Sequence, residues 1–466
     1  MLNRSKNRKF FASKELLILN YSLLILFSSC SVSSQISKEA NKTILKDSAA
    51  SKGFIGISIY DPATGKYLYN YNATKYFTPA SNTKLFSLYA GMKYLGDSLV
   101  SARYYHYGKA LFINPAGDPT FLHPDYDYQP LFKLLDDAKG DIWINAYTDR
   151  INKYGKGWSH DDYNESYMTE KSKFPIYGND VWISSSPIYP KNLLKDTIID
   201  TAKNFGSYWA WIKPKYFADA IQSTANSMKI KITRDILINR FLIEEDPGSS
   251  DSFKIMAIPF AVNQGRTSLE ILKNILHKNI SHGIGVGLKT QDTILHSQPT
   301  DSLFRPMMHR SDNFFAEQTL LMASNERLGY MNDADIIDTL LNSDLKDIPQ
   351  RPKWVDGSGL SRYNLFTPQS FVYILNKLKN EFGWDRLRNI LPTGGEGTLA
   401  SYFHKDSGFI YAKTGTLSNN CALSGFLITD KGKLLIFSIL ANHYQGSATP
   451  IRKASERFLE AIRHKY

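Results

Sequence analysis

Strand-like segments at both ends of the chain constrain the fold more than any other feature of the sequence. Residues 54–60 alternate as a β-strand does, and residues 67–71 predict a second strand after a turn at 61–65. The segments near the other end that predict strands are 409–413, 422–429 and 434–441. If all of these pair, two distant parts of the sequence share one antiparallel sheet and one core.

Each end of the chain also carries a helical pattern. Residues 36–50 have the spacing of an amphipathic helix, and residues 450–464 place apolar side chains on a single stripe. We expect one helix from each end to pack on the shared sheet. The predicted fold is α/β (α+β), with helices flanking an antiparallel sheet and a helical subdomain beside it.

The chain is too long for a single hydrophobic core. It has 466 residues, 42% of them hydrophobic and 21% charged, which is typical of globular proteins. Residues 98–298 have short strand patterns, aromatic loops and turn clusters, with no sustained helical period in their first hundred residues. We predict a large, mostly β insertion there, with two subdomains. The expected division is a leader at 1–30, a main domain from 31–97 and 299–466, and the insertion.

The first thirty residues predict export. Five basic residues lie within the first fourteen, an apolar run follows at 16–27, and small residues precede Cys30. Because this end resembles a bacterial lipoprotein signal, we expect Cys30 to carry lipid and to anchor the protein to a membrane facing the periplasm. The alternatives are an ordinary cleaved signal and an uncleaved anchor. No later segment is apolar for long enough to span a bilayer.

The formal net charge of the chain is +12. A basic surface suits anionic wall polymers and lipid head groups as well as nucleic acid. Because the leader predicts export, we expect no nucleic-acid partner.

A serine and a lysine stand one helical turn apart at 81–84. Pro79 precedes them and an apolar run follows, as expected where a helix begins. Residues at i and i+3 share a helix face, so the Lys84 amine would lie beside the Ser81 hydroxyl. A neutral lysine in that position can take the serine proton and activate the oxygen as a nucleophile. Taken alone, a capping serine followed by a surface lysine is the commoner explanation.

Two further motifs follow along the chain. Ser311-Asp312-Asn313 precedes a helical stretch at 314–322, where a hydroxyl and an amide could relay a proton and bind a peptide backbone. Lys413-Thr414-Gly415-Thr416 lies at the end of the predicted strand 409–413, where Gly415 lets a substrate strand approach closely. Lys413 would supply positive charge for a carboxylate. Taken singly, these motifs are also explained as a helix cap and an edge lysine.

The three motifs in this order resemble the signature of penicillin-binding proteins and serine β-lactamases. Ser81 and Ser311 are 230 residues apart, and the chain is similar here to one family with a large insertion at this place. That family is the D-alanyl-D-alanine carboxypeptidase/endopeptidase of the penicillin-binding-protein-4 type, peptidase family S13. The stretches that resemble it are 79–86, 117–120, 356–361 and 391–399.

The resemblance implies a transpeptidase-like catalytic domain and the residues that act in it. Ser81 would be acylated by the penultimate D-alanine carbonyl of a peptidoglycan stem peptide, with Lys84 as general base. Ser311 and Asn313 would line the second wall of the cleft, and Lys413 completes the catalytic set. Water would then release the acyl-enzyme, and β-lactams would acylate the same serine.

The resemblance also implies residues that bind substrate. Thr414 and Thr416 would bind the terminal carboxylate together with Lys413, beside Gly415. The backbone N–H groups of Ser81 and Thr416 would form the oxyanion hole. The segment 157–162 is similar to a family segment that reaches the cleft, so Asp162 is the candidate contact for the free amine of the stem peptide. A loop-fixing hydrogen-bond acceptor is the alternative role for Asp162.

No metal or cofactor is expected. The ten histidines include no His-Glu-x-x-His, and no phosphate-cradling glycine loop follows a strand. The leading interpretation is therefore a DD-carboxypeptidase, with DD-endopeptidase activity as a further possibility. The alternatives are a serine β-lactamase or esterase on the same scaffold, and a catalytically silent wall-binding protein.

Overall fold

The computed structural model describes most of the chain after the leader. The described residues are 32–184, 201–204, 209–225, 231–245, 256–283 and 293–466. The leader prediction, including lipid on Cys30, lies outside the described residues. Within those ranges, the structure has no helix long and apolar enough to cross a membrane.

One antiparallel sheet joins the two ends of the chain, as the strand patterns predicted. The order is β15-β16-β17-β1-β2, so the N-terminal hairpin pairs with the C-terminal strands through β1 and β17. Seven register pairs join these two strands, from Phe54 opposite Asn442 to Tyr60 opposite Ile436. The strands are β1 (Phe54–Asp61), β2 (Lys66–Tyr71), β15 (Ile410–Leu417), β16 (Asn420–Ile428) and β17 (Leu434–Asn442).

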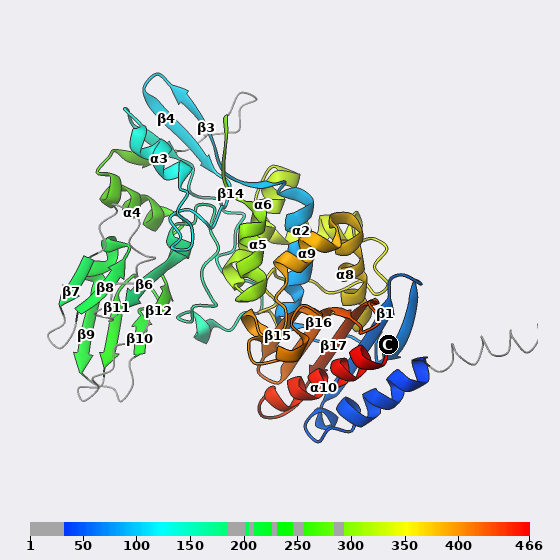
Figure 1. Ribbon diagram of the computed structural model, residues 1–466. Helices are drawn as coiled ribbons and strands as arrows, with labels where there is room; N and C mark the ends of the chain where they lie inside the picture. Colours follow the sequence, from blue (N-terminus) through cyan, green and yellow to red (C-terminus); the bar gives the residue numbers. More distant parts are fainter. Residues whose placement is uncertain (1–31, 185–200, 205–208, 226–230, 246–255, 284–292) are drawn as a thin grey trace, which may run out of the picture.

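Helices cover both faces of this sheet (Figure 1). The C-terminal helix α10 (Thr449–Lys465) lies beside the N-terminal helical segment on one face, and both contribute to a core with the apolar side chains of β1. On the other face, α8 (Pro368–Phe382) packs on β16 and β17, and α2 (Lys84–Tyr94) packs against α8 in the same core. The alternation of the strands therefore divides their apolar side chains between two cores.

The predicted N-terminal helix differs from the structure in its bounds. Helix is present at 32–40 and continues as a π-helical turn, η1 (Asn41–Leu45), whereas the pattern predicted 36–50. The Asp47 carboxylate accepts hydrogen bonds from the N–H groups of Ala49 and Ala50, at 3.0 and 3.2 Å, and so stabilises a turn. Aspartate favours such local bonds over continued helix, which explains the early end.

A helical layer adjoins the sheet and surrounds α2. Phe304, Phe315 and Leu320 are buried in the same core as α2 and α8. This layer corresponds to the predicted helical subdomain. Its further helices are α5 (Thr300–His309), α6 (Asn313–Leu328), α7 (Asp333–Asn342) and α9 (Trp384–Ile390).

The described residues between 98 and 298 form three sheets, as expected for a mostly β region, and lie beside the helical layer (Figure 1). The first sheet is mixed, with order β13-β5-β4-β3-β14; the others are β12-β6-β8-β7 and β10-β11-β9. The strands of the first sheet are β3 (Ser98–Tyr107), β4 (Ala110–Pro115), β5 (Ile142–Ile144), β13 (Ile280–His282) and β14 (Thr293–Pro299). Those of the other two are β6 (Asp180–Ser184), β7 (Thr201–Asn204), β8 (Trp209–Lys213), β9 (Ile221–Ala225), β10 (Lys231–Arg234), β11 (Phe241–Glu245) and β12 (Met256–Pro259).

Two α-helices interrupt the described part of this β region. The structure has α3 (Pro130–Asp137) where no sustained helical period was expected, and α4 (Arg266–Leu276) further on. α3 has only eight residues and two buried side chains, Leu131 and Leu135. So short a segment gives too few turns for a periodic signal, which explains the omission.

The first and last strands of 98–298 pair with each other. β3 and β14 are antiparallel neighbours, with Thr293 opposite Tyr104 and Pro299 opposite Ser98. An inserted unit that leaves and rejoins a parent domain at one place must have its two ends close together, and this pairing brings them together. We keep the division at 97/98 and 298/299 as a proposal, and this pairing supports it.

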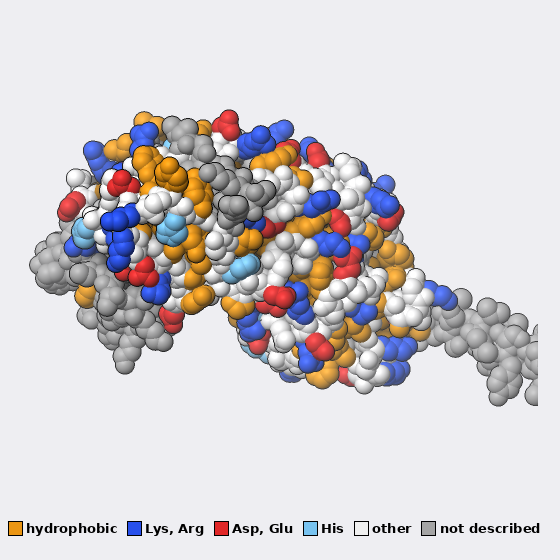
Figure 2. Space-filling view, turned by 90° about the horizontal axis from the view of Figure 1, so that it is seen from above, with side chains coloured by type: hydrophobic (Ala, Val, Ile, Leu, Met, Phe, Trp, Pro, Cys, Tyr) orange, Lys and Arg blue, Asp and Glu red, His pale blue; other side chains and the backbone are white. Residues whose placement is uncertain are grey.

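Charged side chains of both signs are interspersed on the face seen in Figure 2. Lys and Arg side chains stand among Asp and Glu side chains over this surface. On this face, the Lys and Arg side chains that give the chain its net positive charge are therefore distributed over the surface among acidic ones.

Candidate active site

Ser81 lies in a single turn of 3₁₀-helix, η3 (Ala80–Thr83), that leads into α2 at Lys84. The i to i+3 spacing places the Lys84 Nζ 2.9 Å from the Ser81 Oγ, as the sequence predicted. Ser81 is partly exposed, whereas Lys84 is fully buried. The structure thus presents a hydroxyl to the surface with an amine directly behind it.

The Lys84 amine is held by three acceptors. It donates to the Ser81 Oγ, to the Asn313 Oδ1 at 2.6 Å and to the Ser358 carbonyl at 2.8 Å. Burial lowers the pKa of Lys84 to about 8, although Asp356 and other carboxylates nearby oppose this shift. With a pKa of about 8, a minor fraction of the amine is neutral near pH 7, far more than for a lysine in water, and this fraction can accept a proton.

Ser311 and Asn313 come from the start of α6. Asp312 caps this helix, because its side chain accepts from the Phe315 N–H at 3.0 Å. Ser311 precedes the cap in the left-handed conformation, with φ of 61°. The turn that results places Asn313 against Lys84, and the Asn313 Nδ2 donates to the Tyr167 carbonyl at 2.9 Å.

Lys413 lies within β15, not at the end of a strand as the sequence suggested. The strand continues to Leu417 because its residues stay paired with β16, with Lys413 opposite Ser424 and Thr416 opposite Cys421. The fully buried Lys413 amine donates to the Ser311 Oγ at 2.9 Å and to the Thr414 carbonyl at 2.7 Å. Burial, reinforced by the nearby positive charges of Lys84 and Arg452, holds the pKa of Lys413 well below its usual range.

Gly415 allows β15 to run directly against the serine turn. A methyl group at this position would lie 2.7 Å from the Pro79 carbonyl oxygen and 3.0 Å from the Ser81 nitrogen. Only glycine fits so close an approach. β15 is also the edge strand of its sheet, so the strand edge beside Ser81 is available to a peptide.

The neighbouring threonines differ in environment. The Thr414 Oγ1 donates to the Thr398 Oγ1 at 2.7 Å, and Thr414 is largely buried. Thr416 is exposed, and its hydroxyl accepts a hydrogen bond from Arg452 of α10. Motif reasoning did not single out Arg452, because an arginine in an amphipathic helix gives no signal of its own.

A loop between α7 and α8 supports the lysine from behind. Asp356 accepts from the Gly359 N–H at 2.9 Å and from the Ser361 N–H at 2.6 Å, which fixes the turn that carries the Ser358 carbonyl. Gly359 has φ of +82°, and a methyl group there would collide with the Ala80 carbonyl. The sequence showed this stretch only as a family resemblance and gave it no role in the site.

Buried charges join the insertion to this loop. Glu317 of α6 accepts from the Ser358 N–H at 2.8 Å, and the Lys171 ammonium lies 3.9 Å from its other oxygen. Burial and the nearby Asp356 raise the pKa of Glu317. Lys171 also pairs with Asp333, and these carboxylates outweigh its burial, so the pKa of Lys171 is raised.

The segment 157–162 lies against the same loop. The Trp158 Nε1 donates to the Asp356 Oδ2 at 2.8 Å. Asp162, the candidate amine contact, lies in the short turn η4 (His160–Asp162) and is partly exposed. Its carboxylate hydrogen-bonds to the Tyr167 side chain and raises the pKa of that phenol, after the larger effect of burial. Tyr167 thus links Asp162 to Asn313, because its side chain bonds to the Asp162 carboxylate and its carbonyl accepts from the Asn313 amide.

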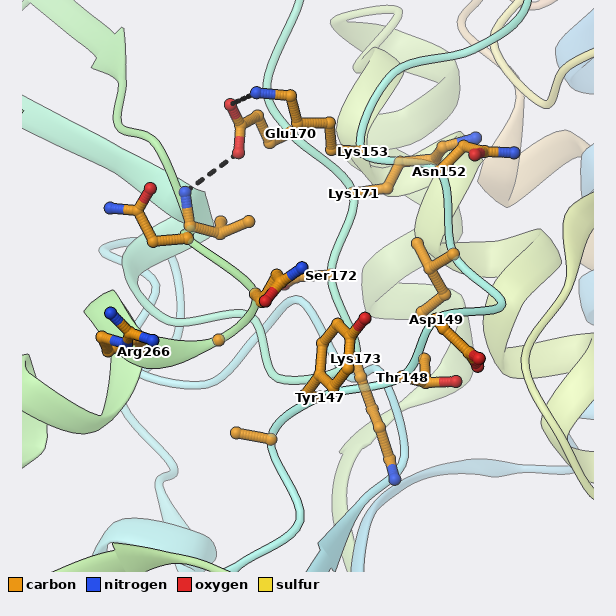
Figure 3. A pocket seen from close by; sticks show the side chains of 16 residues that line it. Tyr147, Thr148, Asp149, Asn152, Lys153, Glu170, Lys171, Ser172, Lys173 and Arg266 are labelled. Atoms are coloured by element: carbon orange, nitrogen blue, oxygen red, sulfur yellow. Dashed lines mark hydrogen bonds and ion pairs between the residues drawn. The ribbon is translucent and has the colours of Figure 1, made fainter. Parts of the chain in front are cut away.

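A separate pocket of about 650 Å³ opens within the insertion (Figure 3). Its lining is polar: Glu170 accepts from the Lys153 ammonium at 3.2 Å and from the Val262 N–H at 2.9 Å. The pocket includes none of the residues predicted for catalysis. It is lined by 146–149, 151–153, 170–173 and 262–266.

The part of the chain that the structure describes contains no candidate metal site. No group of three or more His, Cys, Asp or Glu side chains there could hold an ion. What the arrangement offers instead is a partly exposed hydroxyl with two buried amines, an amide and an edge strand close to it. These are the elements of nucleophilic acyl transfer.

Comparison with known proteins places this arrangement in a family. Over 456 residues the chain is 25% identical to the D-alanyl-D-alanine carboxypeptidase of Actinomadura sp. (strain R39), with 88% of this chain and 82% of that protein covered. Its fold is similar to that of penicillin binding protein 4 (dacB) from Haemophilus influenzae, with a TM-score of 0.68 and 20% identity. That match covers 92% of this chain and 99% of the other.

A second structure of the Haemophilus influenzae protein, complexed with a β-lactam, has a TM-score of 0.63 and 17% identity. These likenesses confirm the predicted penicillin-binding type of α+β fold. The family model described as D-Ala-D-Ala carboxypeptidase 3 (S13) family matches residues 38–462. The predicted recognition is thereby confirmed, and the chain belongs to the D-Ala-D-Ala carboxypeptidase 3 (S13) family.

Proposed function

We propose that this chain is a serine-type D-Ala-D-Ala carboxypeptidase that hydrolyses peptidoglycan stem peptides through a Ser81 acyl-enzyme. The observation that carries the proposal is the 2.9 Å contact between the buried Lys84 amine and the Ser81 hydroxyl. Membership of the S13 family and a relative named D-alanyl-D-alanine carboxypeptidase support a DD-carboxypeptidase.

Acylation begins with transfer of the Ser81 proton to neutral Lys84. The Ser81 oxygen then attacks the carbonyl carbon of the penultimate D-alanine. As the tetrahedral intermediate collapses, the peptide C–N bond breaks and the terminal D-alanine leaves with a proton. Asn313 keeps the Lys84 amine aimed at the oxygen, because it accepts one of its hydrogen bonds at 2.6 Å.

The leaving amine needs a proton donor on the far side of the groove. The Ser311 hydroxyl accepts from Lys413 at 2.9 Å, so a proton can pass from the lysine through the serine to the departing nitrogen. The Lys413 amine is thus the proposed source of this proton, because it contacts the Ser311 hydroxyl directly. Lys84 then releases to solvent the proton that it took from Ser81, and Lys413 takes one up, so that both amines regain their starting states. Water next attacks the acyl-enzyme carbonyl, Lys84 accepts the proton of that water, and the same proton passes to the Ser81 oxygen as the acyl C–O bond breaks.

The substrate backbone is proposed to extend β15 at its free edge. Gly415 admits the peptide next to Ser81, and the N–H groups of Ser81 and Thr416 would stabilise the oxyanion. One such donor is typically worth about 3 to 4 kcal/mol in the transition state. Asp162 is proposed to contact the free amine of the stem peptide.

The same site is proposed to be acylated by β-lactams and to cut crosslinked stem peptides. The Haemophilus influenzae protein of similar fold was crystallised with a β-lactam, which supports the first of these. Export to the periplasm with lipid on Cys30 remains a proposal that the leader sequence supports.

Labelling with a fluorescent penicillin tests the proposal. We expect the wild-type protein to be labelled at Ser81 and the Ser81→Ala variant to take up no label. A pentapeptide ending in D-Ala-D-Ala and a crosslinked dimer then separate carboxypeptidase from endopeptidase activity. If both peptides stay intact while the β-lactam is rapidly hydrolysed, the chain is a β-lactamase instead.

A further inference from the structure

The pocket in the insertion is lined by more cations than anions (Figure 3). Its charged side chains are those of Lys153, Lys171, Lys173, Arg266, Asp149 and Glu170. Two of these lysines already have carboxylate partners. Lys153 lies 3.2 Å from Glu170, and the buried Lys171 pairs with Asp333, outside the pocket. Within the described ranges, no carboxylate lies at ion-pair distance from Lys173 or Arg266, and no cation at that distance from Asp149.

The Lys173 amine is largely withdrawn from water without an anion beside it. When the Asn145 amide is oriented so that both of its terminal atoms are bonded, its oxygen accepts from the Lys173 amine at 2.8 Å. Burial lowers the pKa of Lys173 to about 8, whereas nearby carboxylates raise the pKa of Lys171. A buried charge without an ionic partner costs free energy, and a bound anion would offset this cost.

The unpaired charges surround one space. In Figure 3, Arg266 lies on one side of the pocket and Asp149 on the opposite side, with Lys173 beside Tyr147 between them. Arg266 and Asp149 are exposed, and Tyr147 is 36% exposed, so all three are open to contact. The volume of about 650 Å³ falls within the range of pockets that enclose small ligands, about 300 to 1,000 Å³.

The charges specify the chemistry of a ligand. Two cations and one carboxylate are complementary to a molecule that carries at least two carboxylates and one amine. A guanidinium matches a carboxylate in geometry, and a partly buried ammonium adds a second, charge-assisted donor. A stem peptide from which the D-alanines have been removed has this composition, because its glutamate and diaminopimelate residues keep free carboxylates and a free amine.

We propose that this pocket binds an acidic peptide, with Lys173 and Arg266 on its carboxylates and Asp149 on its amine. The inference rests on the proposed function for the identity of that peptide, which is a trimmed stem peptide of the wall. The pocket includes none of the residues predicted for catalysis, so a peptide bound there leaves Ser81 free. The insertion would thus hold the protein on one wall strand while Ser81 acts on another.

Calorimetric titration of the full chain with two peptides tests this. The first is L-alanyl-γ-D-glutamyl-meso-diaminopimelate, which has no D-Ala-D-Ala bond to cut, and the second is the same peptide with its carboxylates converted to amides. For the acidic peptide, Lys173→Met should weaken binding by about 10- to 100-fold, because a charged hydrogen bond is lost. The exposed Arg266→Gln should weaken it by about two- to fivefold. For the amidated peptide, we expect Lys173→Met to change the affinity by less than about twofold.

Two controls separate the pocket from the rest of the molecule. Lys231→Met removes an exposed lysine of β10, in another sheet of the insertion, and should leave the affinity for the acidic peptide unchanged. Wild-type protein that has first been acylated at Ser81 by benzylpenicillin should bind the acidic peptide as tightly as free protein does. The rate of this acylation should be the same in the pocket variants, which reports an intact fold.

Several results would overturn the proposal. These are no binding of the acidic peptide to the wild type, equal affinities of the wild type and Lys173→Met, and loss of binding after acylation of Ser81. Tighter binding of an N-acetylglucosamine trimer that does not depend on Lys173 would assign the pocket to sugars and would also overturn it. A wild-type protein that penicillin does not acylate at Ser81 would instead refute the proposed function, since the peptide titrations do not require acylation.

Discussion

The Lys84 side chain shows how the fold sets the chemistry of a single residue. Burial favours the neutral amine, whereas Asp356, Glu317 and Asp312 favour the charged form, and burial prevails. Hydrogen bonds from the amine to Ser81 and two other acceptors fix its direction. A lysine in water would be protonated at neutral pH and could not act as a base.

This environment predicts the pH dependence of acylation. Lys84 accepts the serine proton only when neutral, and its pKa is about 8. We therefore expect the rate of Ser81 labelling by penicillin to rise with pH up to about 8 and to level off above it. Stopped-flow labelling between pH 6 and 10 measures this, with circular dichroism as the control for an intact fold. A rate that is flat, or still rising steeply at pH 10, would contradict the assignment of Lys84 as the base.

At the scale of an element, the start of α6 joins stability to function. The Asp312 cap satisfies the Phe315 N–H and at the same time orients the residues on either side of it, Ser311 and Asn313. The next helix, α7, has an equivalent cap in Asn332, whose side chain accepts from the Asp335 N–H at 2.9 Å. Each cap accepts a hydrogen bond from a backbone N–H in the first turn of its helix, but only Asp312 adjoins the candidate site.

Removal of each cap should separate the two effects. Asp312→Ala and Asn332→Ala are each expected to lower the free energy of unfolding by about 1 kcal/mol, measured by urea denaturation. Only Asp312→Ala should also lower kcat/KM, by about tenfold to a hundredfold, since small displacements of reacting groups are costly. Equal kcat/KM values for the two variants would show that the capped turn does not position the catalytic groups.

At the scale of the whole molecule, the insertion is attached to the helical layer and to the loop at 356–361 by buried and half-buried groups. The Trp158 indole reaches Asp356, and the Lys171 ammonium reaches Glu317 and Asp333. The loop that contains Asp356 also carries the Ser358 carbonyl, and the helix that contains Glu317, α6, also carries Asn313. Both of these groups accept hydrogen bonds from Lys84. The insertion therefore contributes to the environment of a base that lies outside it.

Replacing Lys171 should test how much the packing between the insertion and the helical layer depends on this buried charge. Lys171→Met leaves buried carboxylates unpaired, and we expect it to lower the free energy of unfolding by about 3 to 5 kcal/mol. Without the ammonium, the folded-state pKa of Glu317 rises further above its unfolded value. The free energy of unfolding of this variant is therefore greatest below the pKa of Glu317 in the unfolded state, and it falls as the pH rises through the pKa of Glu317 in the folded state. The difference in stability between the wild type and the variant should thus be larger at pH 8 than at pH 5.

Two variants check this interpretation. Adding Glu317→Gln keeps an acceptor for the Ser358 N–H and should recover part of the stability of Lys171→Met. Lys133→Met, which removes an exposed pair with Asp137, should have little effect at either pH. Denaturation midpoints that do not depend on pH in Lys171→Met would contradict the assigned coupling.

The sequence by itself determined the local features of this protein. Alternation and turn residues placed the hairpin at 54–71 and the C-terminal strands, and the i, i+3 spacing placed Lys84 beside Ser81. These features depend on residues close together in the chain, whose backbone geometry is nearly fixed by element type. The order of the three motifs then identified the family.

Only the tertiary structure decided what surrounds those residues. The Ser358 carbonyl on Lys84, the Tyr167 carbonyl on Asn313 and the guanidinium of Arg452 on Thr416 come from segments far apart in the sequence. A backbone carbonyl has no residue signature, and a single arginine in an amphipathic helix looks like any solvated charge. Burial, which sets the pKa of both lysines, arises when the sheet, the helical layer and the insertion pack together, so no local pattern can encode it.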